Sequence, residues 1–595
     1  MGVTWTDPNA RIDGTIQVRT RDLGTGRWTG WRTLEADGTA AGDRRGSTDP
    51  LWVGRSNGVE ARIAGDRGAL PAGLRVDLIN PDAERPSGRI ESAPAMTSAP
   101  MPARPVPRMV TRAGWGANET IVRSAPAYTG PVQVFFVHHT ATGNGYSCRD
   151  SAAIVRGIQA YQIRIKGWDD IGYNFLVDKC GTIFEGRGGG VGRNVLGAHT
   201  LGFNTDASAV AVIGTYDAVG VSPAVRTAIA TVAAYKLGAA GNPPNGKVVY
   251  TSGGGDRYPL GRRVTMYRIS GHRDAGRTDC PGDSLYRQLP QIRAIAGAAP
   301  IGLRLLRVPG AVKLGPLLYT RGAIRPLWTV ATPSALIARF EIWVDGKLAI
   351  AAPGSHRTTA LRLAPGGHTV AVRAVHLSGR AVTTAVRVVS DAKAPVFTYG
   401  PDVALRTGSL DGSVPIRLGW RATDVNGLSA VRLLRPASIN LGVATRSRTG
   451  TVKPAVPATF GLRATDRAGN AVSASVTRTP IVVSEGVARR TGIWHALRNP
   501  RHLGGVALGS TTAGSTASWT FTGRSAALAV SRATGSGRMR IRVDGADQGA
   551  IDLRAPRTRY REAVWTRYWS SSGTHTVRIS VERPGVVLDG LVFLK

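Results

Sequence analysis

The sequence predicts a multidomain protein: a central α/β domain, with a mixed sheet flanked by helices, joined to one N-terminal and three C-terminal all-β sandwich-like domains. Its 595 residues suffice for about four domains of ordinary size. The chain contains 75 Gly and 35 Pro, which favours short strands and many turns over long helices. Strand-like and helix-like segments alternate only between about residues 108 and 300, and the flanking regions are strand-like throughout.

The first predicted domain is a small β-sandwich over residues 1–80. It contains five short segments of strand character separated by turns, at 15–20, 28–34, 51–55, 59–65 and 74–79. Residues 81–107 follow with seven prolines and few large apolar residues. This composition predicts a stiff, exposed linker.

The central domain, residues 108–300, alternates strands with helices. The expected strands are VQVFFVHHT at 132–140, a hairpin at 173–186, SAVAVIGTY at 208–216 and VTMYRISGH at 264–272. The expected helices are 151–167, 222–241 and a closing helix from Asp283. The glycine run GRGGGVG at 186–192 follows a hairpin and opens no clear helix, so it is predicted to be a flexible loop and not a phosphate-binding loop.

Residues 301–595 return to strand character. LRATDRAGNAV at 462–472 resembles VRAVHLSGRAV at 372–382, which predicts two immunoglobulin-like sandwiches over 301–393 and 394–485. The last predicted domain is a basic β-sandwich over 486–595. Asp424 and Asp466 are expected to form turns in the sandwiches, with calcium ligation as the alternative.

The net charge of +37 indicates attraction to polyanions, of which nucleic acid and phosphate-bearing wall polymers are two candidates. No nucleic-acid-binding motif is visible, so we do not expect a nucleic-acid partner. No stretch approaches the roughly 18 uncharged apolar residues that span a bilayer, so no membrane span is expected.

The densest chemical signal lies at the ends of two strands of the central domain. His138 and His139 end one strand, and His272 and Cys280 follow another, eight residues apart. A catalytic zinc ion uses three nitrogen or sulfur ligands and keeps one position open, which one of the paired histidines together with His272 and Cys280 would provide. The alternative is two core histidines and an inert buried cysteine.

Five blocks in this region occur in an order that resembles a known family. The blocks are RAGWGA (112–117), FVHHTAT (136–142), GWDDIGYNFLVDKCGTIFEGR (167–187), GAHTLGFN (197–204) and GHRDAGRTDCPG (271–282). They resemble the peptidoglycan recognition proteins, which belong to the zinc-dependent N-acetylmuramoyl-L-alanine amidases of the phage-lysozyme type. The resemblance covers about 190 residues.

The resemblance implies a role for individual residues. His138, His272 and Cys280 match zinc ligands, and Tyr173 matches the catalytic tyrosine. Thr278 matches a second catalytic position, where phage enzymes have lysine and the recognition branch has threonine. His199 and Asn204 match a block that lines the substrate groove, although a turn-forming role is a realistic alternative for Asn204. His139 is expected to be structural, because neighbouring strand residues point to opposite faces.

The implied function is zinc-dependent hydrolysis of the amide between the muramic acid lactyl group and L-alanine in peptidoglycan. The alternative is a peptidoglycan-binding or adhesion protein that does not cleave. Presence of the cysteine ligand favours the enzyme, since the purely binding members of the family lack it.

Two further cysteines, Cys148 and Cys180, lie outside the metal motif and flank the expected active-site face. We predict that they form a disulfide with Cα atoms within about 7 Å, which would persist only in an oxidising compartment. No basic-then-apolar leader follows Met1. The disulfide nevertheless points to a protein that is secreted or held in the cell wall.

The last domain has 17 basic and 6 acidic residues between 487 and 595, with Trp565, Tyr568 and Trp569 close together. Aromatic faces stack on sugar rings, and arginine binds phosphate with two parallel hydrogen bonds. We therefore expect this domain to bind glycans or anionic wall polymers. The alternative is a basic sandwich whose aromatic residues belong mostly to its core.

Overall fold

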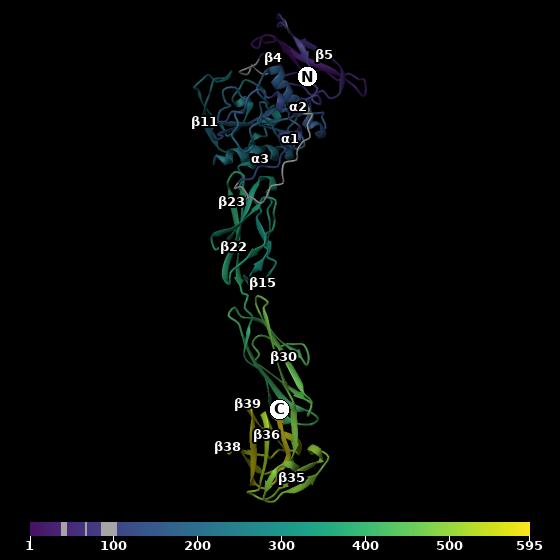
Figure 1. The fold of residues 1–595 in the computed structure, drawn as a ribbon, viewed down its shortest axis with the longest axis vertical. Coiled ribbons are helices and arrows are strands. Elements are labelled where there is room, and N and C mark those ends of the chain that lie inside the picture. Colours follow the sequence, from purple (N-terminus) through teal and green to yellow (C-terminus); the bar gives the residue numbers. More distant parts are fainter. Residues whose placement is uncertain (37–43, 66–67, 85–103) are drawn as a thin grey trace. The chain divides into compact units, whose positions relative to one another are not determined.

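The computed structural model describes residues 1–36, 44–65, 68–84 and 104–595. They form two compact units, which are described separately (Figure 1). Unit 1 comprises Met1–Val308, Arg325–Thr359 and Thr369–Val386, and unit 2 comprises Pro309–Ile324, Ala360–His368 and Arg387–Lys595. Most of the predicted linker at 81–107 lies outside the described residues, because 85–103 are not among them.

Unit 1 begins with two three-stranded antiparallel sheets, with strand orders β4-β1-β6 and β3-β2-β5. The strands are β1 (Gly2–Trp5), β2 (Thr15–Asp22), β3 (Arg32–Thr33), β4 (Gly46–Ser47), β5 (Ser56–Ala64) and β6 (Arg75–Asp77). In β2 the buried residues Ile16, Val18 and Thr20 alternate with more exposed ones, because only one face of the sheet contacts the core. The predicted strand at 51–55 is wrong: this segment is irregular, and Leu51 exchanges backbone hydrogen bonds with Met1.

The central domain contains a mixed five-stranded sheet, as predicted, with strand order β13-β7-β10-β8-β9. The strands are β7 (Val134–His139), β8 (Phe175–Val177), β9 (Ile183–Glu185), β10 (Ala207–Val212) and β13 (Ile269–Gly271). All pairs are parallel except the β8–β9 hairpin. The middle strands β7 and β10 are buried along their whole length, because both faces of the sheet are covered.

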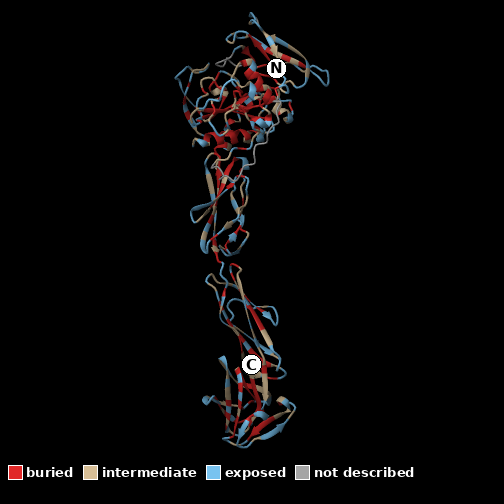
Figure 2. Cartoon of the chain, in the orientation of Figure 1, coloured by how far each residue is buried: buried red, intermediate tan, exposed pale blue. Residues whose placement is uncertain are grey.

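Five α-helices belong to this domain: α1 (Arg112–Trp115), α2 (Ser151–Tyr161), α3 (Pro223–Ala239), α4 (Asp283–Tyr286) and α5 (Leu289–Ala296). The long helix α3 starts where Ser222 Oγ accepts the N–H of Val225 and Pro223 occupies the first turn. Helix α3 packs on the β7 face that carries Phe135 and Val137. Figure 2 shows buried residues, in red, concentrated in these helices and strands.

The opposite face of β7 carries Phe136, which packs against Phe203 and the hairpin of β11 (Lys247–Thr251) and β12 (Arg263–Tyr267). His138 follows Phe136 on this face, and His139 follows Val137 on the other. Because β7 and β13 are parallel neighbours, their carboxyl ends meet at one edge of the sheet. The two strands therefore place His138 and His272 close together.

Beyond the central domain, unit 1 contains β14 (Arg304–Arg307), β18 (Leu327–Thr329), β19 (Ile337–Val344) and β20 (Lys347–Pro353), with most of β22 (Gly366–His376) and part of β23 (Ala381–Ser390). Strand β14 pairs with β18, and β19 pairs with both β20 and β22. Trp328 and Phe340 are buried, with ring centroids 5.3 Å apart. This part of the predicted 301–393 sandwich is strand-rich, as expected.

Unit 2 contains the strands β15 (Ala311–Leu314), β16 (Leu317–Thr320), β17 (Ala323–Ile324) and β21 (Leu361–Arg362), then a sandwich of two sheets. One sheet has β24 (Val396–Leu405), β26 (Val414–Thr423) and β29 (Ser447–Val452). The other has β27 (Leu428–Arg435), β28 (Ile439–Asn440), β30 (Ala458–Asp466) and β31 (Ala471–Arg478).

The C-terminal part of unit 2 is built on one ten-stranded sheet. Its strands are β25 (Gly408–Ser409), β32 (Pro480–Ser484), β33 (Arg489–Thr491), β34 (His495–Arg498), β35 (Val506–Ser510), β36 (Thr516–Arg532), β37 (Arg538–Val543), β38 (Ala546–Asp552), β39 (Arg559–Arg583) and β40 (Val586–Leu594). One hydrophobic core contains both Trp420 and Leu594, so residues 394–485 and 486–595 share a core. No α-helix in the described ranges is long and apolar enough to cross a membrane.

Candidate active site

His138, His272 and Cys280 come together at the carboxyl edge of the central sheet. One ligand atom from each lies within 4.8 Å of the others, and His138 and Cys280 are buried. Nδ1 of His138 lies 3.7 Å from the Sγ atom of Cys280. Nδ1 of His272 is buried and has no hydrogen-bond partner among the described residues. Two imidazole nitrogens and one thiolate are a donor set that fits zinc, so these residues could hold the ion.

The loop that carries His272 and Cys280 is held in place by hydrogen bonds to its own backbone. The chain turns at a short 3-10 helix, His272–Asp274, where Asp274 Oδ2 accepts the N–H of Gly271. The N–H of Arg273 then donates to the carbonyl of Cys280, which closes the loop. Oγ1 of Thr278 accepts the N–H of Cys280 at 3.0 Å. Thr278 therefore supports the position of the cysteine within the loop.

Burial keeps the site histidines neutral. Burial, helped by the neighbouring histidines, lowers the pKa of His138 well below its ordinary value. Burial also lowers the pKa of His272 to about 4, although the carboxylates of Asp49 and Asp256 act in the opposite direction. A neutral imidazole offers a lone pair to a metal without first losing a proton. At neutral pH both side chains are therefore ready to act as ligands.

Tyr173 and His199 border the metal-ligand cluster. The ring centroid of His138 lies 5.4 Å from that of Tyr173 and 5.4 Å from that of His199. Tyr173 is half-buried, two residues before the start of β8, and His199 is buried. The five predicted residues Tyr173, His199, His138, His272 and Cys280 thus lie in one neighbourhood.

Thr200, for which the motif blocks imply no role, connects the two imidazoles. Its Oγ1 lies 3.3 Å from Nε2 of His138 and 3.0 Å from Nδ1 of His199. If Nδ1 of His138 faces the metal, its Nε2–H donates to Thr200, whose hydroxyl donates to Nδ1 of His199. Nε2 of His199 then carries a proton. The only sequence signal for Thr200 is its place beside His199 in the GAHT block.

Asn204 acts on the backbone of this segment. Its Oδ1 accepts the N–H groups of His199 and Thr200, at 3.0 and 2.9 Å. This geometry favours the turn-forming alternative for Asn204. It also holds the backbone of His199 and Thr200 against the turn.

His139 lies on the other face of β7 and is not part of the cluster, as strand alternation predicts. The N–H of Tyr216 donates to Nδ1 of His139 at 3.4 Å, and Nε2 of His139 lies 3.4 Å from a carboxylate oxygen of Glu35. Glu35 lies in the irregular segment that follows β3, in the N-terminal part of unit 1. The sequence gives no signal for this contact, because 104 residues separate the two side chains.

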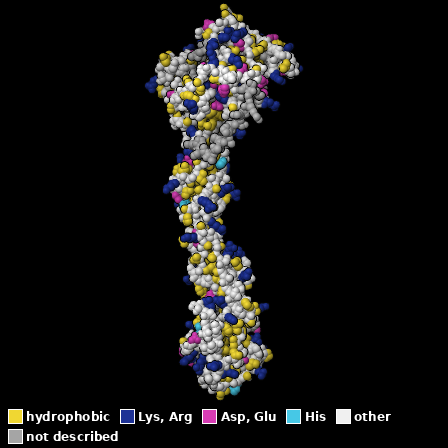
Figure 3. All heavy atoms as spheres, in the orientation of Figure 1, with side chains coloured by type: hydrophobic (Ala, Val, Ile, Leu, Met, Phe, Trp, Pro, Cys, Tyr) yellow, Lys and Arg dark blue, Asp and Glu magenta, His cyan; other side chains and the backbone are white. Residues whose placement is uncertain are grey.

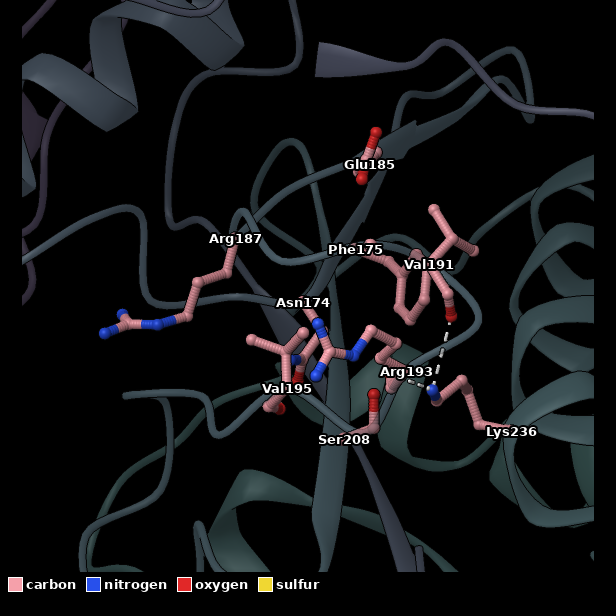
Figure 4. A pocket seen from close by; sticks show the side chains of 10 residues that line it. Asn174, Phe175, Glu185, Arg187, Val191, Arg193, Val195, Ser208 and Lys236 are labelled. Carbon is pink, nitrogen blue, oxygen red and sulfur yellow. Dashed lines mark hydrogen bonds between the residues drawn. The ribbon is translucent and has the colours of Figure 1, made fainter. Parts of the chain in front are cut away.

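The glycine run at 186–192 forms a loop, as predicted, and borders a small pocket beside β8 (Figure 4). Lys236 on α3 donates to the carbonyls of Val191 and Arg193, at 3.3 and 2.7 Å. Burial lowers the pKa of Lys236 to about 8. The lysine thus ties the loop to α3 and is not directed at the metal-ligand cluster.

Cys148 and Cys180 form a disulfide with Cα atoms 6.4 Å apart, which confirms the predicted bond. It joins a short 3-10 helix before α2 to the turn between β8 and β9. Cys280 forms no disulfide and is buried. The remaining thiol is therefore the one assigned to the metal.

In the C-terminal domain, the three aromatic residues do not form an exposed platform. The hydroxyl of Tyr568 donates to Asp402, and Trp569 stacks on His575 with ring centroids 3.9 Å apart. Trp565 packs against the domain core. The structure therefore favours the alternative in which these aromatic residues serve mainly internal packing.

Asp424 and Asp466 form turns, as expected. Asp424 Oδ1 accepts the N–H of Asn426, and Asp466 Oδ1 accepts the N–H of Asn470. Oxygens of both lie within 4.8 Å of Asp391. Calcium ligation remains an untested alternative.

Comparison with known proteins agrees with the geometry. The family model described as N-acetylmuramoyl-L-alanine amidase matches residues 128–283, and one described as Rv3811 N-terminal galactose-binding domain-like matches 1–99. Peptidoglycan recognition protein 1 of Bos taurus is 33% identical over 187 residues, covering 31% of this chain and 83% of that protein.

The N-acetylmuramoyl-L-alanine amidase of Homo sapiens is 34% identical over 185 residues, covering 30% of this chain and 27% of that protein. A crystal structure of human PGRP-IBETAC in complex with glycosamyl muramyl pentapeptide is 29% identical, with a TM-score of 0.24, covering 30% of this chain and 92% of that one. The match to the bovine protein spans most of that relative and coincides with the domain that carries the metal-ligand cluster. The chain belongs to the peptidoglycan recognition protein and N-acetylmuramoyl-L-alanine amidase family.

Proposed function

We propose that the protein is a zinc-dependent N-acetylmuramoyl-L-alanine amidase. It would hydrolyse the amide between the lactyl group of muramic acid and L-alanine in bacterial peptidoglycan. The observation that carries the proposal is the cluster of His138, His272 and Cys280 beside Tyr173. Recognition proteins and an amidase are both among the relatives, so family membership alone does not decide between binding and cleavage.

The donor set and its electrostatics support a resident zinc ion. The three ligand atoms are close together, the histidines are neutral at pH 7, and Nδ1 of His272 lacks a hydrogen-bond partner among the described residues. When bound, zinc would polarise the scissile carbonyl and lower the pKa of a coordinated water to about 7.

The residues around the cluster would hold the substrate and respond to charge that develops on it. The phenol of Tyr173, next to His138, would donate a hydrogen bond to the carbonyl oxygen as negative charge builds on it. With Nδ1 of His199 accepting from Thr200, its Nε2–H would be a second donor close to His138. Thr278 keeps the Cys280 loop in place, and Asn204 keeps His199 oriented.

The experiment that tests this proposal compares the wild-type chain with Cys280→Ser. We expect the variant to lose zinc and to stop releasing amino groups from purified wall, while it still sediments with the wall. Zinc content by elemental analysis and amino-group release are measured on the same samples. A variant with one zinc per chain and full activity would overturn the ligand assignment.

The second candidate function is peptidoglycan binding without cleavage. If the wild-type chain loaded with zinc binds wall and releases no amino groups, this candidate holds. The presence of Cys280 favours cleavage over binding alone, because a binding protein needs no thiolate ligand for a metal.

We also propose that the protein works outside the cytoplasm, at the cell wall. The disulfide between Cys148 and Cys180 supports this location, because such bonds persist in oxidising compartments.

A further inference from the structure

One outer face of the C-terminal sheet carries arginines that lie directly opposite one another. Arg542 on β37 is paired in register with Arg578 on β39. Arg578 is paired with Ser518 on β36, and Ser518 is paired with Arg489 on β33. Residues opposite one another in antiparallel strands share a face, so Arg489, Arg542 and Arg578 form one row across four strands (the arginine row).

The burial pattern confirms that this face is open. In β37 the residues at 538, 540 and 542 are exposed or half-buried, whereas Met539, Ile541 and Val543 are buried. In β39 Arg578 is exposed between the buried residues Val577 and Ile579. The arginine row thus projects away from the hydrophobic core.

Within the described part of the chain, the charge of the row is compensated only at Arg542, which lies opposite Asp547 on β38 and interacts electrostatically with it. The two acidic residues nearest to it on this face, Asp547 and Glu582, form ion pairs with Arg540 and, for Glu582, also with Arg538. No ion pair with a described residue is found for Arg489, Arg542 or Arg578. Like charges that face each other across strands are destabilising. Arg578 faces Arg542 and Ser518, and Arg489 faces Ser518, so neither has a carboxylate directly opposite it. An anion that lies across the row would neutralise the positive charge that remains on this face.

The rest of the face offers hydroxyl groups and no aromatic ring. Thr520 faces Thr576 and Thr522 faces Thr574, with hydroxyl oxygens 2.9 and 3.0 Å apart. The aromatic residues of β36, Trp519 and Phe521, are buried on the other side. Sugar rings and the bases of single-stranded nucleic acid need an aromatic surface for stacking, and duplex DNA is read by an element that enters a groove. A flat face of guanidinium and hydroxyl groups suits phosphate.

We propose that the arginine row is the binding surface for a phosphodiester-linked polyol polymer of the cell wall. Each guanidinium can hold a phosphate through two hydrogen bonds, and the neighbouring threonine hydroxyls can bind the polyol. Strands are about 4.8 Å apart, so Arg542, Arg578 and Arg489 span roughly 15 Å along the polymer. Figure 3 shows dark blue Lys and Arg side chains over the visible face of this C-terminal part. The surface is separate from the proposed amidase site and would act whether or not the chain cleaves peptidoglycan.

The test measures binding of the full chain to a poly(glycerol phosphate) oligomer as a function of salt. The triple variant R489A/R542A/R578A should bind at least about 10-fold more weakly, and its slope of log affinity against log salt should fall by about two. The control variant R498A/R557A/R567A removes three exposed arginines of the same domain that lie outside the row. It should change affinity less than about 3-fold.

If R489A/R542A/R578A and the control R498A/R557A/R567A weaken binding equally, the polymer responds only to net charge, and the proposal is overturned. Unchanged affinity of R489A/R542A/R578A would also overturn it. The variant R489K/R542K/R578K keeps the charge and loses the planar fork. Because lysine preserves the surface charge and fold, weakened binding by this variant supports the proposal even if the alanine variant folds poorly.

Two further measurements distinguish a wall polymer from nucleic acid as the source of the phosphate, and binding from amidase activity. Single-stranded DNA with the same number of phosphates should bind more weakly than poly(glycerol phosphate) and should not depend on the row. DNA binding that is equally tight and equally sensitive to the row variant would overturn the assignment to a wall polymer. Release of amino groups from a soluble peptidoglycan fragment should be the same in all variants, so failure of this proposal is distinguishable from failure of the proposed amidase activity.

Discussion

The hydroxyl of Thr200 lies between the imidazoles of His138 and His199, and this position gives it a role in metal binding. A partner that holds the outer nitrogen of a ligating histidine fixes its tautomer and orientation. We predict that Thr200→Val lowers zinc affinity about 10- to 100-fold. Competition with a chromogenic chelator measures the affinity. Thr231→Val, a buried threonine on α3, is the control, and equal zinc affinity in the two variants would rule out the role of Thr200.

Tyr173 is expected to act on the substrate and not on the metal. Loss of one oxyanion donor typically costs about 10²–10³ in rate, so Tyr173→Phe should lower turnover by that factor and leave zinc affinity unchanged. Steady-state kinetics on a soluble peptidoglycan fragment, with zinc content measured in parallel, tests this. Tyr128→Phe, an exposed tyrosine of the same domain, is the control. If Tyr173→Phe keeps wild-type turnover, Tyr173 is a structural residue.

At the residue scale, the sequence predicted those features that depend on neighbouring residues in the chain. The side of β7 on which His138 and His139 lie follows from strand alternation, and the three metal ligands follow from the motif blocks. Thr200 and Glu35 could not be predicted, because their contacts join residues 62 and 104 positions apart in the chain. For Asn204 the sequence left two roles open, and the hydrogen bonds to the backbone favour the turn.

At the scale of elements, the disulfide ties the start of α2 to the β8–β9 hairpin. It closes a loop with a sequence separation of 32 residues. In the chain-entropy description such a loop is worth about 3–4 kcal/mol, because the cross-link restricts the unfolded chain. The double variant C148S/C180S should lose about this free energy of unfolding, measured by denaturant titration of the central domain's transition. The same variant compared with the wild type under reducing conditions should show no difference, and a difference there would contradict the account.

Strand β22 ends at His376, which is fully buried and accepts the N–H of Ser378 at Nδ1. Burial lowers its pKa from 6.5 to about 4. Between these two values the unfolded chain binds a proton that the folded chain does not, so folded-state stability falls as the pH is lowered from about 6.5 to about 4. We predict that His376→Gln removes this loss of stability, which amounts to about 2–3 kcal/mol at pH 4.

The measurement for His376 is the free energy of unfolding of wild type and variant at several pH values. The difference in the free energy of unfolding between the two proteins should be constant above pH 7. As the pH falls to 4, the wild type should lose stability relative to the variant. A difference that does not change between pH 7 and pH 4 would show that the folded and unfolded histidines titrate alike.

Most elements of the central domain were predictable, because apolar periodicity marks them directly. The strand at 134–139, the hairpin and helix α3 lie where the pattern places them, whereas the predicted helix at 151–167 keeps α-helical geometry only to Tyr161 and the closing helix is split into α4 and α5. The predicted strand at 51–55 was wrong because Leu51 is held by a tertiary contact with Met1. Such contacts override a local strand signal.

At the scale of the whole molecule, the sequence predicted separate sandwiches over 394–485, from a repeat, and over 486–595, from its strand character. Within unit 2, however, β25 pairs with β39 and β32 pairs with β40, and one core includes residues from both segments. Strand β39 has 25 residues and β36 has 17, so each is long enough to contribute to more than one layer. A sequence repeat reports similar local units and cannot show that two of them share a core.

Mass analysis of digested wall decides whether zinc held by His138, His272 and Cys280 makes this chain an amidase. Purified peptidoglycan is incubated with the protein, with and without a zinc chelator, and the soluble products are identified by mass. The account predicts free stem peptides that begin with L-alanine, together with glycan strands that keep intact lactyl groups, and neither product when the chelator is present. Products cut at another bond, or the same products in the presence of the chelator, would contradict it.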